Sequence, residues 1–142
     1  MTATQSFFID VLSLFNKDNL FCKFQSSDDH LIEAIMQYDK DVVIDNYSAF
    51  FPLNIYSKKI LVDTVIRYNS EENMHYFEIK GNGLPLFLAF DGFEIAEIVA
   101  DLEFSEHFIE QYIRTNLCIV LEKIIYPHDQ LKYNIKPVRI KF

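Results

Sequence analysis

The sequence predicts a single α+β domain spanning residues 1–142, with an antiparallel sheet of about five strands and helices packed on one face of it. Two observations predict this class. Some segments repeat apolar residues at helical spacing, whereas others are runs of β-branched and aromatic residues, and polar turns separate them. The chain has 142 residues with 50% of them apolar, which supports one full hydrophobic core. No internal repeat or break in composition divides the chain.

The N-terminal part predicts a helix, a strand and a second helix, in that order. Residues 4–16 carry apolar side chains at a spacing of 3.6 residues, and Thr4 or Ser6 can cap this helix. Apolar residues alternate from 20 to 24, as in a short strand. Two serines then precede two aspartates, which is typical of a helix start, and the second helix should end near Asp39. Residues 41–56 are harder to predict: residues 42–44 could start a strand, the aromatic run 47–51 could be a short helix, and Pro52 ends whatever precedes it.

The middle of the chain predicts a β-hairpin. Residues 58–68 and 74–80 are rich in β-branched and aromatic residues, and a polar turn at 69–73 separates them. Residues 81–83 form a second turn. The apolar run 84–90 follows and predicts a buried strand.

The last third predicts two helices followed by strands. Asp91 and Glu94 resemble a capping box, and apolar residues at helical spacing follow up to residue 102. Ser105 can cap a further helix. Residues 117–126 permit either a helix or a strand, and we favour a strand; a final strand at 131–142 changes phase at Pro137, which predicts a bulge.

The residues that usually carry chemistry show no site spacing. The two cysteines, Cys22 and Cys118, each lie in an apolar run and are expected to be buried, reduced thiols. His107 is the best titratable candidate, because Glu103 and Glu110 lie near it in the sequence, but metal motifs on helices carry more ligands than this. We therefore expect no catalytic residue, no metal and no cofactor, and we interpret the His107 region as a solvated polar face.

Charge is the one feature that stands above background. The net charge is −8, which disfavours DNA, RNA and anionic membranes as partners. Residues 28–45 hold six acids and one lysine. In the last eleven residues, by contrast, every charged side chain is basic. Residues 91–110 hold seven acids and no lysine or arginine, and we expect these seven to form a partner-binding surface: Asp91, Glu94, Glu97, Asp101, Glu103, Glu106 and Glu110.

These observations favour a non-enzymatic, acidic, cytoplasmic binding protein whose partner is a basic protein. Bacterial immunity proteins, which neutralise nuclease toxins, are such a class, and an immunity or antitoxin-type inhibitor of a toxin domain is the first hypothesis. One alternative is a small protein similar to secretion chaperones. The other is a small-molecule-binding or enzymatic domain with a site assembled from histidine, tyrosine and carboxylates distant in sequence. The cytoplasmic expectation rests on an N-terminus without the basic start and continuous apolar run of a secretory signal, and no apolar run is long enough to span a membrane.

Overall fold

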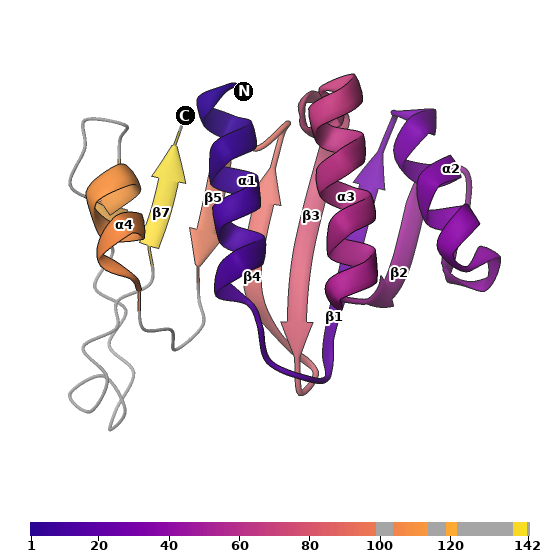
Figure 1. Ribbon diagram of the computed structural model, residues 1–142, viewed down its shortest axis with the longest axis horizontal. Helices are drawn as coiled ribbons and strands as arrows, with labels where there is room; N and C mark the ends of the chain where they lie inside the picture. The colour runs from indigo at the N-terminus through magenta and orange to yellow at the C-terminus, as the bar shows by residue number, and fades with distance from the viewer. Residues whose placement is uncertain (99–103, 114–118, 122–137, 142) are drawn as a thin grey trace.

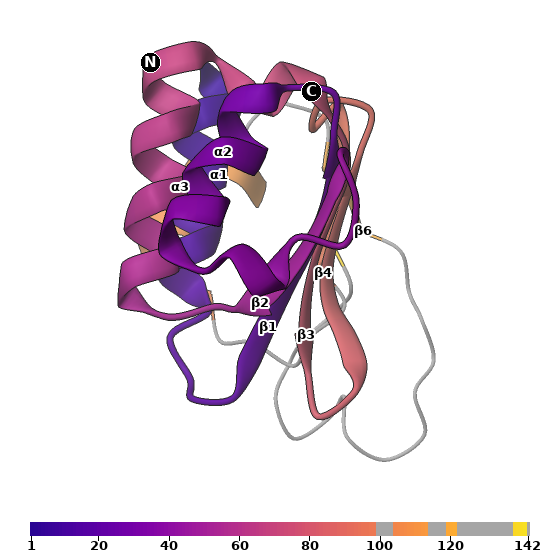
Figure 2. The same ribbon diagram turned by 90° about the vertical axis from the view of Figure 1, so that its right-hand side faces the viewer.

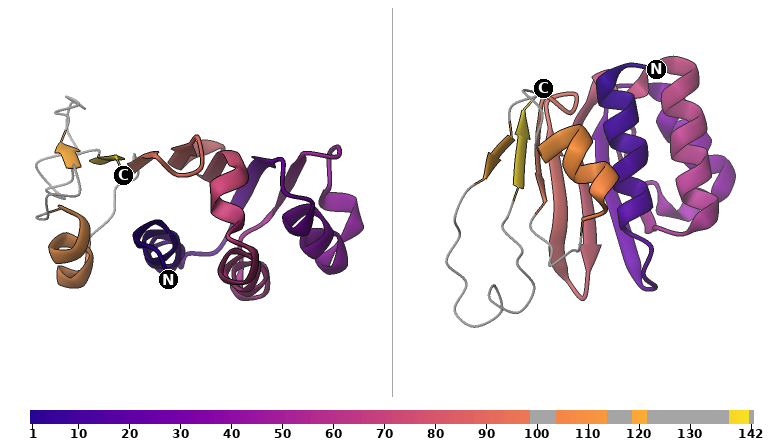
Figure 3. Two further views of the ribbon diagram at one scale, coloured as in Figure 1. Left: turned by 90° about the horizontal axis from the view of Figure 1, so that it is seen from above. Right: turned by 60° about the vertical axis from the view of Figure 1, so that its left-hand side comes forward.

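The computed structural model is a single sheet with helices on one of its faces, which confirms the α+β class (Figure 1). It describes residues 1–98, 104–113, 119–121 and 138–141. Seen from above, the described helices all lie on the same side of the sheet (Figure 3). Within these residues, no helix is both long and apolar enough to cross a membrane.

The sheet is antiparallel between every pair of described neighbours, and its strand order is β2-β1-β3-β4-β5-β7-β6. Strands β1 to β5 form its main body, which meets the expectation of about five strands. Two short strands, β7 and β6, extend the sheet beyond β5. The strand bounds are β1 Leu20–Ser26, β2 Ser48–Pro52, β3 Met74–Gly81, β4 Leu84–Phe90, β5 Ile95–Ile98, β6 Ile119–Leu121 and β7 Val138–Lys141.

Three helices cover the sheet (Figure 2). A side chain caps the start of each of them. Thr2 caps α1 (Ala3–Leu14), Asp28 caps α2 (Asp29–Tyr38) and Asn54 caps α3 (Ile55–Tyr68). Each cap binds backbone N–H groups that the first helical turn leaves without a partner. Short helical turns complete the chain: η1 Lys40–Val42, η2 Ser70–Asn73, α4 Glu106–Phe108 and the π-helical η3 Ile109–Ile113.

The first two predicted helices and the strand between them are confirmed, although the caps lie elsewhere than predicted. The predicted short aromatic helix before Pro52 is wrong, because those residues form β2. Phe51 is buried against the ring of Phe24 at 5.8 Å while Phe50 is partly exposed, which is the alternation of a strand. Of the strand that could have started at 42–44, only the single bridge from Val43 to Ala49 forms.

The predicted hairpin between 58–68 and 74–80 is wrong, because 58–68 belongs to helix α3. The buried residues of α3 are Ser57, Leu61, Thr64 and Val65, which lie at helical spacing on one face. Packing of this face and the cap at Asn54 therefore override the β propensity of the individual residues. Residues 74–80 do form a strand, β3, which pairs with β1 and β4.

The hairpin in this region joins β3 to β4 and turns at Asn82-Gly83. Both turn residues have positive φ, 54° and 75°, as a two-residue type I′ turn requires. The strand predicted at 84–90 is confirmed as β4. The Asn-Gly pair is the local signal that fixes this hairpin.

The predicted helix after Asp91 is also wrong, because residues 95–98 form strand β5 between β4 and β7. Asp91, Gly92 and Phe93 have φ of 53°, 70° and 67°, whereas a helix N-cap needs an extended backbone. Further along, Ser105 does cap a helix, since its hydroxyl accepts a hydrogen bond from the Phe108 N–H at 3.1 Å. The strands predicted at 117–126 and 131–142 are represented by β6 and β7, and Pro137 lies outside the described residues.

The core lies between the helices and the sheet and consists largely of phenylalanine rings. Cys22 is fully buried in it, as predicted, and Cys118 lies outside the described residues. The fully buried rings are Phe7, Phe8, Phe24, Phe51, Phe77, Phe87, Phe93 and Phe108.

Candidate functional site

Three turns that are distant in sequence meet at one end of the sheet, at the top of Figure 1. They are residues 27–29 at the start of α2, η2 after α3, and residues 91–94 between β4 and β5. The backbone N–H of Ser27 donates to the Asn73 carbonyl at 3.1 Å, and that of Gly92 donates to the Met74 carbonyl at 2.7 Å. The η2 turn therefore lies between the other two turns and joins them.

We call these three turns the acidic end, because each contributes two carboxyl groups and none contains lysine or arginine. Asp29, Glu72, Asp91 and Glu94 are exposed, whereas Asp28 and Glu71 are buried. Carboxylates gathered in this way create a negative electrostatic potential that attracts cations and repels anions.

Asp28 is buried but well supplied with partners. Its Oδ1 accepts hydrogen bonds from the His30 backbone N–H at 2.9 Å and contacts the His30 ring Nδ1 at 2.8 Å. Burial would raise the pKa of Asp28, but hydrogen bonds from Ser70 and His30 together hold this pKa below its usual value. Asp28 is therefore an ionised carboxylate behind the exposed turns.

Glu71 is the opposite case. Its side chain is 1% exposed, and its Oε2 has no hydrogen-bond partner in the described structure. Burial raises the pKa of Glu71 and the charge of Glu72 raises it further, whereas hydrogen bonds from the Glu71 backbone and the Gln5 side chain offset only part of this rise. Because buried polar atoms without partners are rare and costly, the unpaired Oε2 lowers the stability of the fold at the acidic end.

Phe93 fixes the turn that carries Asp91 and Glu94. A bulky residue with positive φ is uncommon, and here the ring is fully buried. It meets the ring of Phe8 edge to face at 5.2 Å and lies 5.5 Å from the ring of Phe77. Packing of this ring thus holds the strained turn in place.

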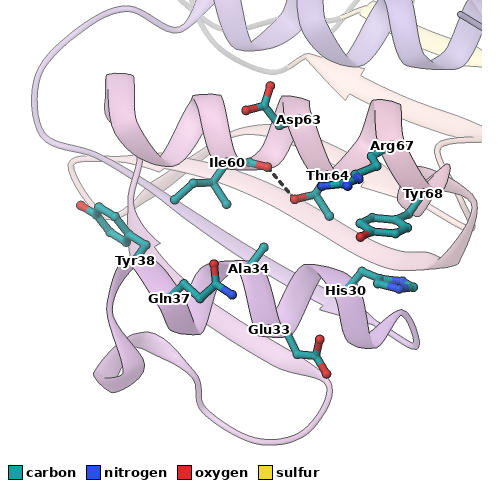
Figure 4. Close-up of a pocket in the computed structure, with 10 residues that line it drawn as sticks. All are labelled: His30, Glu33, Ala34, Gln37, Tyr38, Ile60, Asp63, Thr64, Arg67 and Tyr68. Carbon is teal, nitrogen blue, oxygen red and sulfur yellow. Dashed lines mark hydrogen bonds between the residues drawn. The ribbon is translucent and has the colours of Figure 1, made fainter.

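A groove of about 380 Å³ runs between α2 and α3 from the acidic end (Figure 4). At that end the rings of His30 and Tyr68 stack in parallel, 3.7 Å apart. At the other end Asn54 Nδ2 donates to the Tyr38 hydroxyl at 3.0 Å. The groove is lined by His30, Glu33, Ala34, Gln37, Tyr38, Ile60, Asp63, Thr64, Arg67 and Tyr68.

The structure describes five of the seven acids predicted to form one surface, and these five do not lie on one helix face. Asp91 and Glu94 are exposed at the acidic end, whereas Glu97 is half-buried in β5 and therefore does not share a helix face with Glu94. Glu106 and Glu110 are exposed on α4 and η3, and residues 101 and 103 lie outside the described part. Sequence reasoning missed Asp29 and Glu72 as neighbours of Asp91, although it had marked the acidic run at 28–45.

His107 contacts a carboxylate that the sequence did not suggest. Its Nε2 lies 3.4 Å from Asp10 Oδ2 on α1, and the Tyr112 hydroxyl donates to the same oxygen at 2.5 Å. These contacts tie α4 and η3 to α1. Among the described residues, no cluster of three histidine, cysteine or acidic side chains could hold a metal ion.

Comparison with known proteins gives no relative from which a function could be transferred. No protein-family model matches the chain, and neither a curated protein nor a solved structure matches it. The function therefore has to be argued from the acidic end and the groove beside it.

Proposed function

We propose that this chain is a non-enzymatic binding protein whose acidic end binds a basic protein, in the manner of an immunity or antitoxin-type inhibitor. The observation that carries the proposal is the convergence of three acidic turns, with η2 between the other two. Two acidic runs, each notable in the sequence, supply neighbouring carboxylates: Asp29 from the first, and Asp91 and Glu94 from the second. An exposed field of one sign speeds encounter with a partner of the opposite sign.

Two further features support a binding role for this end. The buried Glu71 carboxyl and the positive φ of Phe93 both cost stability at the same place. Several features that lower stability at one surface are typical of functional sites, where selection for binding outweighs selection for stability. A nuclease toxin is a fitting partner, because carboxylates can occupy the groove that phosphates normally enter.

The test uses two variants with the same total change of charge. The acidic-end variant carries Glu72→Lys, Glu94→Lys and Asp91→Asn; asparagine is chosen because it tolerates the positive φ at this position. The opposite-end variant carries Asp18→Lys, Asp41→Lys and Asp39→Asn near the ends of α1 and α2, and asparagine preserves the cap that Asp39 provides.

Where a basic toxin domain is encoded next to the gene, each protein is co-expressed with that toxin domain. The unmodified chain and the opposite-end variant should protect the cells and co-purify with the toxin. The acidic-end variant should fold, because exposed charges usually change stability by about 0.5 kcal/mol or less each, but it should fail to protect. Full protection by the acidic-end variant would refute the proposal.

The second candidate is a small-molecule-binding or enzymatic domain that uses the groove between α2 and α3. One observation favours it: Tyr68 of α3, which is distant in the chain, stacks on His30, and the neighbouring Asp28 carboxylate contacts the His30 ring beside this groove. A histidine oriented by a carboxylate can act as a general base. A catalysed reaction that slows in Asp28→Asn while toxin protection stays absent in every variant would favour this candidate.

A further inference from the structure

His30 is held more rigidly than an exposed histidine needs to be. Asp28 Oδ1 binds its Nδ1 at 2.8 Å and the ring of Tyr68 covers one of its faces at 3.7 Å, yet half of the side chain is exposed. No described residue bonds to its other nitrogen, Nε2. A rigid polar ring with one open nitrogen, at the edge of a proposed partner surface, has the form of a preorganised anchor.

The contact with Asp28 decides which nitrogen of His30 carries the proton. An ionised carboxylate has no proton to give, so Nδ1 must donate to it. In the neutral ring Nε2 is then left as a hydrogen-bond acceptor. In this form of the ring, Nε2 of His30 can accept a hydrogen bond from a ligand.

A second acceptor lies one helical turn away. Glu33 is exposed on α2 three residues after His30, and residues at that spacing are neighbours on a helix surface. Both side chains line the mouth of the groove at its Tyr68 end, whereas the Asp63 carboxylate lies on the opposite rim, on α3 (Figure 4). A ligand that contacts both His30 Nε2 and the Glu33 carboxylate needs several hydrogen-bond donors and a positive charge.

We propose that His30 and Glu33 form an arginine-binding anchor, in which a guanidinium group of the basic partner donates to His30 Nε2 and pairs with the Glu33 carboxylate. This inference rests on the proposed function and deepens it. A planar guanidinium presents five donors in a fixed fork and can serve two acceptors at once, whereas an ammonium group is a point charge.

The probes are acetyl-arginine amide and acetyl-lysine amide, titrated into isotope-labelled full-length protein and followed by NMR. The arginine probe should give saturable shifts at His30 and Glu33, and the lysine probe should bind about tenfold more weakly. Nitrogen shifts of the free protein should show the His30 ring protonated at Nδ1. A ring protonated at Nε2, or equal binding of the two probes, would overturn the anchor.

Matched variants separate the contribution of each group. His30→Phe keeps a ring to stack on Tyr68 but removes the acceptor, and Glu33→Gln removes the charge; each should weaken the arginine probe about tenfold. Asp63→Asn makes the same kind of change on the other rim and should leave binding unaltered. Loss of binding only in Asp63→Asn would contradict the anchor.

The anchor and the proposed function can fail separately. The single-residue probe reports on His30 and Glu33, whereas toxin protection reports on the acidic-end variant. Protection that depends on the acidic end, combined with no arginine binding, would remove the anchor alone. Arginine binding without any effect of the acidic-end variant on protection would remove the proposed surface and leave the anchor.

Discussion

The strained turn at Phe93 gives the sharpest prediction about stability. Its φ of 67° penalises any residue with a Cβ atom by about 1–2 kcal/mol relative to glycine. Removing the buried ring costs about 3–5 kcal/mol whichever small residue replaces it. Relative to alanine, glycine also lowers the free energy of unfolding by about 0.4–1 kcal/mol, because it gives the unfolded chain more conformational freedom. Phe93→Gly should therefore be about 0.5–1 kcal/mol more stable than Phe93→Ala, the reverse of the usual order.

The measurement is urea unfolding of both variants, with the same pair of substitutions at Phe87 as the control. Phe87 is equally buried but lies in the extended β4, so Phe87→Ala should be more stable than Phe87→Gly by about 0.5–1 kcal/mol. The urea midpoints of two variants can be compared directly when the free energy of unfolding falls with urea concentration at the same slope in both. If alanine is the better residue at both positions, the account of how this turn is held is wrong.

Three further predictions concern titratable groups and the buried thiol. Asp28 has a lowered pKa, so its stabilisation is present above about pH 4 and lost as the pH falls through the folded-state pKa; in pH-dependent unfolding, Asp28→Asn should lose this dependence. Glu71 has a raised pKa, so stability is lost as the pH rises through it, and Glu71→Gln should gain on the unmodified chain above about pH 4.3. Burial raises the pKa of the Cys22 thiol, and in Cys118→Ser this thiol should react with a disulfide reagent only after denaturation; rapid native labelling would contradict its burial.

Sequence reasoning predicted the layer architecture well where local signals agree with packing. Residues 74–80 and 84–90 became strands because their apolar content and the glycine-containing turn between them point to the same structure. Residues 58–68 were misread because β-branched residues suggested a strand, while the spacing of the buried Leu61 and Val65 with Ser57 is helical. Counting that period, and giving weight to the cap at Asn54, could have identified α3.

The candidate site was harder to predict because it depends on contacts between distant segments. The acids at 91–94 were identified, but their placement was wrong, since three consecutive positive φ angles turn the chain into β5 instead of a helix. The proximity of Glu72 and Asp29 to them arises from hydrogen bonds around η2, which no spacing in the sequence encodes. The stacking of His30 on Tyr68 likewise needs α2 and α3 to pack side by side.

The most direct test of the central claim is the affinity of the full chain for a labelled hexalysine peptide between 50 and 200 mM salt. The unmodified chain should bind it and lose affinity as salt rises, because exposed charges are screened. The acidic-end variant should bind on the order of tenfold more weakly at low salt, whereas the opposite-end variant should stay within about twofold of the unmodified chain. Equal weakening of the two variants would show that only net charge matters, and would contradict a defined basic-partner surface at the acidic end.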